Sequence, residues 1–301
     1  MKTVIFYQHN ELRLGVKSGE KIIDVKAVAE DFPQMEHVPN SIEELISGGE
    51  QSKQALELLV NKVKLEAPYV FDEQSLHLGP CVPHPQKIIC VGLNYKKHAD
   101  ECNMPYPETP ILFSKFTNAL AGHNDEIVLP QASKQVDYEA ELVIVIGKEA
   151  KQVLEAEALS YVYGYCNGND VSARDLQFVS TQWLLGKTSD GFCPIGPYLV
   201  SRDEIADPND LSIKLTLNGE VRQHSNTSDM IFNCAEVISY ISKHMTLYPG
   251  DMILTGTPEG VIMGNPEDSQ QWLKSGDKIT VSIEKLGSLT NVMREDEVSQ
   301  E

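Results

Sequence analysis

The chain has 301 residues, of which 41% are hydrophobic, and a formal net charge of −19 at pH 7. This acidic balance argues against nucleic acid and anionic membranes as partners. No apolar stretch approaches the roughly 20 residues of a membrane-spanning helix, and Met1–Phe6 lacks the core of a signal peptide. The six cysteines form no Cys-x-x-Cys pair. We therefore expect a cytoplasmic protein with free thiols and neither a zinc ribbon nor a thioredoxin motif.

Residues 1–80 are predicted to form a small N-terminal domain and a linker. Three short apolar runs predict strands, and two later segments carry apolar residues at helical spacing: Val4–Tyr7, Leu12–Val16, Lys21–Val25, Ile42–Ile46 and Ala55–Val60. Residues 66–86 are interrupted by several prolines and a glycine, which is typical of a connecting segment.

Residues 81–301 are predicted to form the catalytic domain, rich in strands. The apolar runs that predict these strands are Leu142–Ile146, Tyr161–Cys166, Leu211–Leu217, Met252–Thr255 and Lys278–Ile283. The dipeptide Asn218-Gly219 predicts a tight hairpin turn. Ile231–Met245 is one of the few later segments with helical spacing, and the acidic tail Arg294–Glu301 is expected to be frayed.

Two acidic residues, Glu139 and Glu141, open the apolar strand Leu142–Ile146. Side chains two residues apart on a strand point to the same face, about 6.5–7 Å apart. Two buried carboxylates repel each other unless one is protonated or a cation lies between them. Oxygen-only ligands suit a hard cation such as Mg²⁺ or Mn²⁺. The alternative is a pair of solvated acids at an exposed strand start.

A third acid, Asp170, lies between a predicted strand and a predicted helix. The run Ser172–Asp175 has the spacing of a capping box, which places the start of that helix at Ser172. Such corners often carry ligand-binding residues, but Asp170 could instead be a second cap. Arg174 and Gln177 are three apart and would share a helix face, unless Arg174 only forms a surface ion pair.

A histidine and a glutamate, His98 and Glu101, are also three residues apart in a predicted short helix. They would touch there, and the carboxylate would raise the basicity of the imidazole and hold its orientation. The alternative is an ordinary exposed pair on a helix. The chain has no Gly-x-Gly-x-x-Gly, Gly-x-Ser-x-Gly or His-Glu-x-x-His motif, which argues against dinucleotide, serine-hydrolase and zinc-protease chemistry.

Taken together and in order, these segments resemble the fumarylacetoacetate hydrolase family over about residues 80–290. The segments that carry the resemblance are Gly92–Tyr95 with His98 and Glu101, Asp137–Leu142, Asn169–Asp175 with Gln177, Gly186-Lys187, Cys193–Pro197 and Thr255–Pro258. The resemblance implies an α+β fold that is mainly β, a mixed β-roll or sandwich, and a homodimer. It also implies one Mg²⁺ or Mn²⁺ ion bound by Glu139, Glu141 and Asp170.

Members of this family act on small 2-oxo acids, so the resemblance implies a role for each further site residue. Arg174 and Gln177 would contact the substrate or metal-bound water, Lys187 would supply positive charge, and Thr257 would bind a substrate carboxylate. Taken alone, Lys187 would more readily be a solvated loop charge, whereas Thr257 is equally compatible with a turn-stabilising residue. The pair His98–Glu101 would lie on a lid, Asn94–Glu108, that is mobile without ligand and activates water when it closes.

The leading hypothesis is metal-dependent hydrolysis of a C–C bond in an acylpyruvate, which releases pyruvate. Decarboxylation of oxaloacetate is the first alternative, because the same metal and the same enolate serve both reactions. Isomerisation of unsaturated 2-oxo diacids is the second. A non-catalytic, metal-binding regulatory protein is the alternative from a different class.

Overall fold

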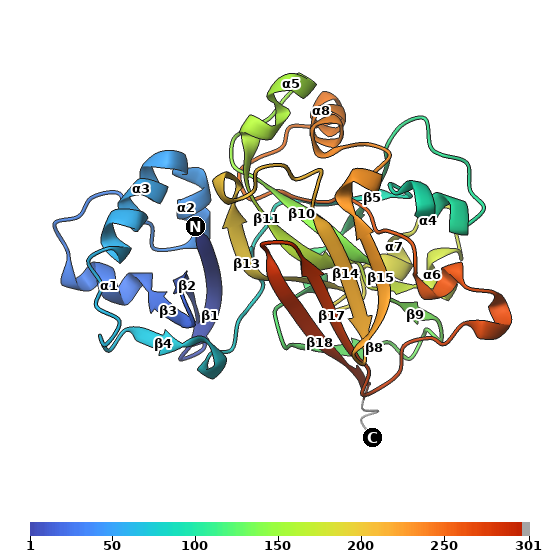
Figure 1. Cartoon of the computed structure of the whole chain (residues 1–301), viewed down its shortest axis with the longest axis horizontal. Helices are drawn as coiled ribbons and strands as arrows, with labels where there is room; N and C mark the ends of the chain where they lie inside the picture. Colours follow the sequence, from blue (N-terminus) through green and yellow to red (C-terminus); the bar gives the residue numbers. More distant parts are fainter. Residues whose placement is uncertain (297–301) are drawn as a thin grey trace.

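The computed structural model of the chain describes residues 1–296 (Figure 1). Its strands are β1 (Lys2–Gln8), β2 (Glu11–Ser18), β3 (Lys21–Asp24), β4 (Val70–Asp72), β5 (Ile88–Gly92), β6 (Ile111–Lys115), β7 (Leu120–Ala121), β8 (Glu126–Leu129), β9 (Val136–Asp137), β10 (Ala140–Ile146), β11 (Val162–Asn169), β12 (Ser172–Ala173), β13 (Cys193–Ser201), β14 (Ser212–Leu217), β15 (Glu220–Asn226), β16 (Met252–Leu254), β17 (Lys278–Ile283) and β18 (Gly287–Glu295). Its α-helices are α1 (Val25–Asp31), α2 (Ile42–Ser47), α3 (Gly49–Val60), α4 (Lys96–Glu101), α5 (Glu155–Ala158), α6 (Arg174–Gln177), α7 (Leu184–Lys187) and α8 (Cys234–His244). None of the described helices is long and apolar enough to cross a membrane.

One long mixed sheet runs through the molecule in the order β4-β3-β2-β1-β13-β11-β10-β16-β5-β6. Its N-terminal strands and the helices α1–α3 lie together at one side of the molecule (Figure 1). They join the rest through β1, which pairs antiparallel with β13. The predicted linker at residues 66–86 is more than a connection, because it contributes β4, which pairs with β3. The prolines that suggested a linker flank this short strand.

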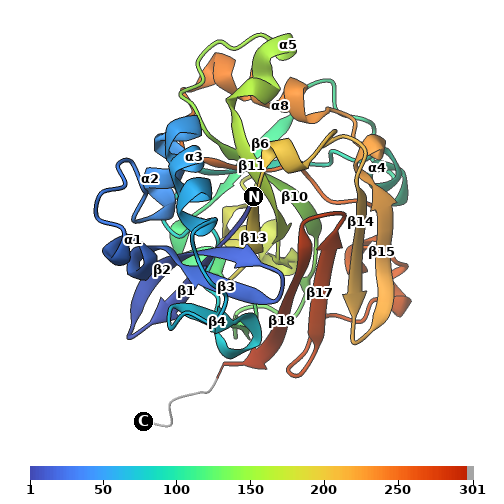
Figure 2. The same ribbon diagram turned by 60° about the vertical axis from the view of Figure 1, so that its left-hand side comes forward.

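A second sheet, in the order β15-β14-β17-β18-β8, packs against the long one. Figure 2 shows its strands lying against β10, β11 and β13. The mainly-β α+β fold of the sequence prediction is therefore confirmed. The predicted hairpin is confirmed too: Asn218 and Gly219 have φ of 53° and 86°, as a two-residue turn between β14 and β15 requires.

The two central strands, β10 and β11, are buried along their whole length. This double-sided burial explains why β10 is a continuous apolar run after its two acids. The antiparallel register places Ala140 opposite Asn169 and Glu141 opposite Gly168. The end of β11, with Asp170 directly after it, is therefore next to the start of β10.

The predicted helix start at Ser172 is wrong. Ser172 lies in β12, which pairs with β9, and α6 begins at Arg174. The Ser172 hydroxyl donates to the backbone oxygen of Asp170, and the Asp175 carboxylate accepts from Ser133 and Lys134. The backbone at Ser172 is therefore part of a strand ladder, so it cannot form the helix start that a capping box requires.

The expectation of a frayed tail is wrong where it can be compared with the structure. Arg294 and Glu295 belong to β18, which pairs in parallel with β8 and antiparallel with β17. Residues 297–301 lie outside the described part of the chain.

Asn167 on β11 links the two sheets, and this gives a first prediction. Its amide accepts from Ile283 N–H at 2.8 Å and donates to the carbonyl oxygens of Gly196 and Leu286 at 2.9 and 3.2 Å. Asn167→Ala would leave these buried groups unpaired, at about 1–3 kcal/mol each. We expect urea unfolding to show a loss of at least about 2 kcal/mol, against less than about 0.5 kcal/mol for the exposed control Gln51→Ala. Equal losses in the two variants would contradict this role.

Candidate functional site

The three predicted metal ligands meet at the start of β10. Glu139, Glu141 and Asp170 are 5%, 1% and 0% exposed, and each offers a carboxylate oxygen that lies within 4.8 Å of the others. The backbone N–H of Asp170 donates to the carbonyl oxygen of Glu139 at 2.9 Å, which fixes the corner. The alternative of solvated acids at an exposed strand start is therefore wrong.

Buried cations surround this acidic set. Lys187 Nζ on α7 lies 2.8 Å from Glu139 Oε2 and 2.9 Å from Asp170 Oδ2. Arg174 Nη2 lies 2.7 Å from Glu139 Oε1. Both side chains are almost fully buried, so neither is the solvated loop charge or surface pair that each would be in isolation.

Lys115 is a member of this cluster that sequence reasoning missed. Its Nζ lies 2.6 Å from Asp170 Oδ1 and donates to three backbone carbonyls, those of Val171, Lys187 and Phe192. A lysine at the end of a strand carries no local signal of burial. Lys115 and Asp170 are far apart in the sequence, and their side chains meet only because the fold places the end of β6 beside the end of β11.

Asp137 is the second missed residue. Its Oδ2 accepts from Arg174 Nε at 3.0 Å, and its two oxygens also accept from the backbone N–H groups of Ile262 and Met263 at 2.9 and 3.0 Å. Arg174 in turn donates to Gln177 Oε1 at 3.0 Å, which confirms the predicted shared face of α6. Asp137 thus orients the arginine and ties it to the loop after β16.

The carboxylates are not equally compensated. Burial opposes ionisation of Glu139, but the charges of Lys187 and Arg174 hold its pKa well below the ordinary value. Among the described residues no side-chain cation forms an ion pair with Glu141, whose oxygen accepts from the N–H of Gly256 at 2.6 Å. Burial and the charges of Asp170 and Glu139 therefore raise the pKa of Glu141 well above its ordinary value.

This donor set fits a hard divalent cation. All of its ligand atoms are carboxylate oxygens, which Mg²⁺ and Mn²⁺ prefer. A cation beside Glu141 would offset the one carboxylate of this set that no cation within residues 1–296 contacts. The ammonium of Lys187, held between Glu139 and Asp170, already shows that positive charge is favoured among these oxygens.

His98 and Glu101 form the predicted pair on α4. His98 Nδ1 lies 2.7 Å from Glu101 Oε1, and the N–H of Gly260 donates to Glu101 Oε2 at 2.9 Å. Burial opposes protonation, but hydrogen bonds with Cys102 and Glu101 and the charge of Glu139 raise the pKa of His98 to about 9. His98 is only 6% exposed, so the alternative of an exposed helical pair is wrong.

The predicted site residues, with the exception of Asp170, line one cavity of about 690 Å³. Asp170 lies behind the wall, with its two oxygens against Lys115 and Lys187. Thr257 is in the wall, and its hydroxyl oxygen accepts from Gln223 at 2.9 Å. The remaining wall is largely apolar, with Phe113 and Trp183 in edge-to-face contact.

The segment predicted as a lid is fixed to the rest of the protein at its N-terminal end, by Asn94. The Asn94 amide donates to the carbonyls of Phe232 and Thr255 and accepts from Phe232 N–H. Asn94 and Tyr95 are fully buried, whereas Asn103–Tyr106 are exposed. Exposure within Asn94–Glu108 is therefore concentrated in its second half.

Comparison with known proteins identifies the family to which the chain is similar. Residues 87–294 match the family model described as fumarylacetoacetate (FAA) hydrolase C-terminal. The fumarylacetoacetate hydrolase domain-containing protein 2 homolog of Dictyostelium discoideum is 57% identical over 218 residues, which are 69% of this chain and 71% of that protein. The mitochondrial oxaloacetate tautomerase FAHD2A of Bos taurus is 43% identical over 282 residues, which are 92% of this chain and 86% of that protein.

A solved structure extends the likeness to the whole fold. Maleylpyruvate hydrolase from Sphingobium sp. SYK-6, in complex with manganese(II) ion and pyruvate, matches with a TM-score of 0.80 and 30% identity. The match covers 99% of this chain and 100% of that one. Because the family model matches residues 87–294 and the bovine relative is 43% identical over 92% of this chain, the chain belongs to the fumarylacetoacetate hydrolase family.

Proposed function

We propose that the protein is a divalent-metal-dependent enzyme that interconverts the enol and keto forms of oxaloacetate. One observation carries the proposal: the pair His98–Glu101 and the acidic residues Glu139 and Glu141 line the same cavity. A proton-transfer group thus lies beside a cation site, as moving a proton next to a ketone requires. The bovine relative named as an oxaloacetate tautomerase, 43% identical over most of this chain, supports the choice of substrate.

The charged residues of the cavity would bind and orient the substrate. A Mg²⁺ or Mn²⁺ ion bound by Glu139, Glu141 and Asp170 would act as a Lewis acid on the adjacent carboxylate and keto oxygens of the 2-oxo acid. Lys187 adds positive charge at this end of the cavity. Because the Thr257 oxygen already accepts from Gln223, its own O–H remains to donate to a substrate carboxylate.

His98 would move the proton. Its Nδ1 is taken by Glu101, so Nε2 is the ring nitrogen that remains for the substrate. With a pKa of about 9, the imidazole carries a proton at neutral pH and is able to deliver it to C3 of the enol. The enol O–H proton would pass to solvent water as the ketone forms, and solvent would then reprotonate the imidazole. In the reverse direction the unprotonated fraction of His98 would take a proton from C3, and the ketone oxygen would take one from water. Glu101 holds the ring in place for both steps.

Hydrolysis of an acylpyruvate C–C bond is the second candidate, and the likeness to a maleylpyruvate hydrolase favours it. In that reaction His98 would have to be unprotonated to take a proton from water, and its raised pKa works against this at neutral pH. Decarboxylation of oxaloacetate needs only the electron sink at the cation site, so it would be a side reaction of the same geometry.

Two further expectations remain proposals. The six cysteines are all free in the structure, which supports a reducing compartment such as the cytoplasm. The homodimer implied by the family resemblance would be checked by light scattering of the purified chain.

The uneven compensation of the acids predicts how metal affects stability. Because the pKa of Glu141 is raised in the folded state, the wild type loses stability as pH rises above the ordinary value of 4.5. Glu141→Gln removes this titration and keeps an acceptor for Gly256 N–H. In EDTA we expect it to raise the melting temperature more at pH 8 than at pH 5.

Added Mg²⁺ should then raise the melting temperature of the wild type and of the exposed control Glu30→Gln, but hardly that of Glu141→Gln. Glu141→Gln should also lose activity. A wild-type enzyme that is fully active in EDTA would contradict the metal assignment.

The dyad predicts the pH dependence of the reaction. Decay of enol absorbance after addition of enol-oxaloacetate should slow as pH rises through about 9, because His98 then loses the proton it delivers. His98→Ala should lower the rate by roughly 10²–10⁴. Glu101→Gln should shift the fall in rate to lower pH, whereas the exposed control Lys96→Gln should leave it in place.

The same enzyme should be assayed for pyruvate release from a panel of acylpyruvates. Pyruvate release without any acceleration of enol decay would reject the tautomerase proposal in favour of hydrolysis.

The lid hypothesis predicts a ligand-dependent change in hydrogen exchange. Without ligand, Asn103–Tyr106 should exchange fast because they are exposed, whereas Asn94 and Tyr95 should already be protected. Oxalate with Mg²⁺, a mimic of the bound 2-oxo acid, should slow exchange in Asn103–Glu108 and leave α8 unchanged. If exchange there is slow in the apo protein and oxalate does not alter it, the segment is a fixed wall.

A further inference from the structure

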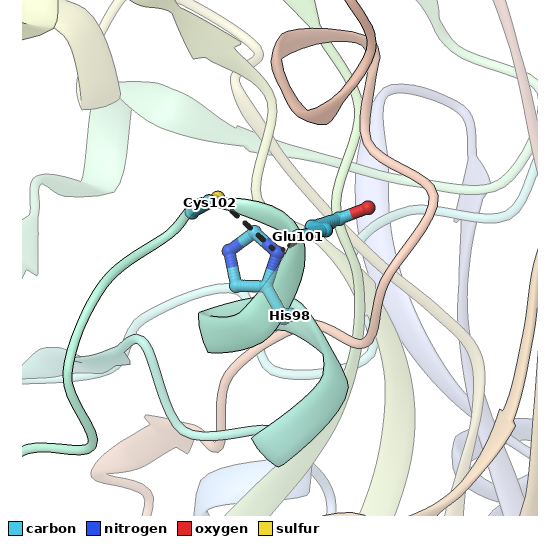
Figure 3. Close-up of side chains that lie close together, drawn as sticks. All are labelled: His98, Glu101 and Cys102. Carbon is cyan, nitrogen blue, oxygen red and sulfur yellow. Dashed lines mark hydrogen bonds and ion pairs between the residues drawn. The ribbon is translucent and has the colours of Figure 1, made fainter.

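We propose that His98, Glu101 and Cys102 form a second cation site, which binds a soft divalent ion such as Zn²⁺ and inhibits the enzyme. The three residues lie at the end of α4, and their ligand atoms all lie within 4.8 Å of one another. His98 Nδ1 is 2.7 Å from Glu101 Oε1 and 3.9 Å from Cys102 Sγ. Figure 3 shows these side chains projecting from one turn of the helix.

The geometry is close to that of a zinc site. Zinc bonds of about 2.0 Å to nitrogen and oxygen and 2.3 Å to sulfur place tetrahedral ligand atoms about 3.3–3.6 Å apart. The two distances from His98 Nδ1 lie on either side of this range. Small side-chain rotations would therefore bring the three atoms into place and leave a fourth position for water.

The chemistry of the donors separates this site from the carboxylate site. Imidazole nitrogen and thiolate sulfur are ligands that zinc prefers, whereas the oxygen-only set of Glu139, Glu141 and Asp170 suits harder cations. Cys102 is also accessible: it is partly exposed and lines the cavity, whereas the other cysteines are buried.

Binding of zinc would remove the proton-transfer pair. The ion would bind His98 Nδ1 and one oxygen of Glu101. It would thereby replace the hydrogen bond between these two atoms, which holds the imidazole ring in its present place. This inhibition rests on the proposed function, whereas the binding does not. Because the ion must displace protons from the imidazole and the thiol, its affinity should rise with pH.

Cobalt(II) provides a direct test, because a thiolate bound to cobalt gives a charge-transfer band in the near ultraviolet. The 301-residue chain in saturating Mg²⁺ is titrated with Co²⁺. We expect the band in the wild type and in Glu141→Ala, where only the carboxylate site is damaged. Cys102→Ser should abolish it, and His98→Ala should weaken the affinity at least about 10-fold, since even outer-shell changes cost that much. Absence of the band in the wild type, its persistence in Cys102→Ser, or an unchanged affinity in His98→Ala would overturn the proposal.

Inhibition is measured separately. With saturating Mg²⁺, Cys102→Ser should need at least about 10-fold more Zn²⁺ than the wild type for half-inhibition, each relative to its own zinc-free rate. Equal sensitivity of the two proteins would overturn the proposal. A cobalt band without zinc inhibition would support the site and contradict the role of His98 in the proposed reaction.

Discussion

The site depends on a shortage of positive charge inside the protein. Its buried carboxylates outnumber the buried cations that contact them: Asp137, Glu139, Glu141 and Asp170 on one side, and Lys115, Arg174 and Lys187 on the other. A buried charge is tolerated only when a partner compensates it. The carboxylate left over is Glu141, whose one partner in the described part of the chain is a backbone N–H. The fold therefore leaves an uncompensated negative charge at Glu141, where a bound cation would be favoured.

The loop after β16 connects Glu141 to the rest of the site. The N–H of Gly256 donates to Glu141, that of Gly260 to Glu101, and that of Ile262 to Asp137. A single backbone segment therefore touches the cation site, the proton-transfer pair and the arginine clamp. Both glycines have φ of +99°, and a Cβ at Gly260 would lie 2.1 Å from the carbonyl oxygen of Arg222. Only glycine fits there without moving the neighbouring strand.

The pair His98–Glu101 places an oriented proton-transfer group at one side of the cavity. Glu101 is held from both sides, by the imidazole and by Gly260 N–H, so the ring is oriented before a substrate arrives. The acidic neighbourhood that demands a cation also favours the protonated imidazole. The same negative charges therefore favour both a bound cation, which would polarise the ketone, and a protonated His98, which would supply the proton. Cys102 Sγ lies 3.9 Å from the same nitrogen, so a soft metal bound by this thiol would compete with Glu101 for it.

The sequence by itself determined the features that depend on near neighbours. The two acids at the start of β10, Asp170 at its corner, the i,i+3 pair on α4 and the Asn218-Gly219 turn are all set by spacings of a few residues. Local rules act through the geometry of one element, so they can be read without the fold.

Only the tertiary structure decided which charges are compensated. Lys115 reaches Asp170, and Asp137 reaches Met263, across long stretches of chain whose meeting depends on sheet order. The same long-range pairing overrode a local signal at Ser172, where a ladder with β9 replaced a capping box. Burial is a property of the packed sheets and not of any one residue. The lone position of Glu141, and with it the demand for a cation, could therefore appear only once the chain had folded.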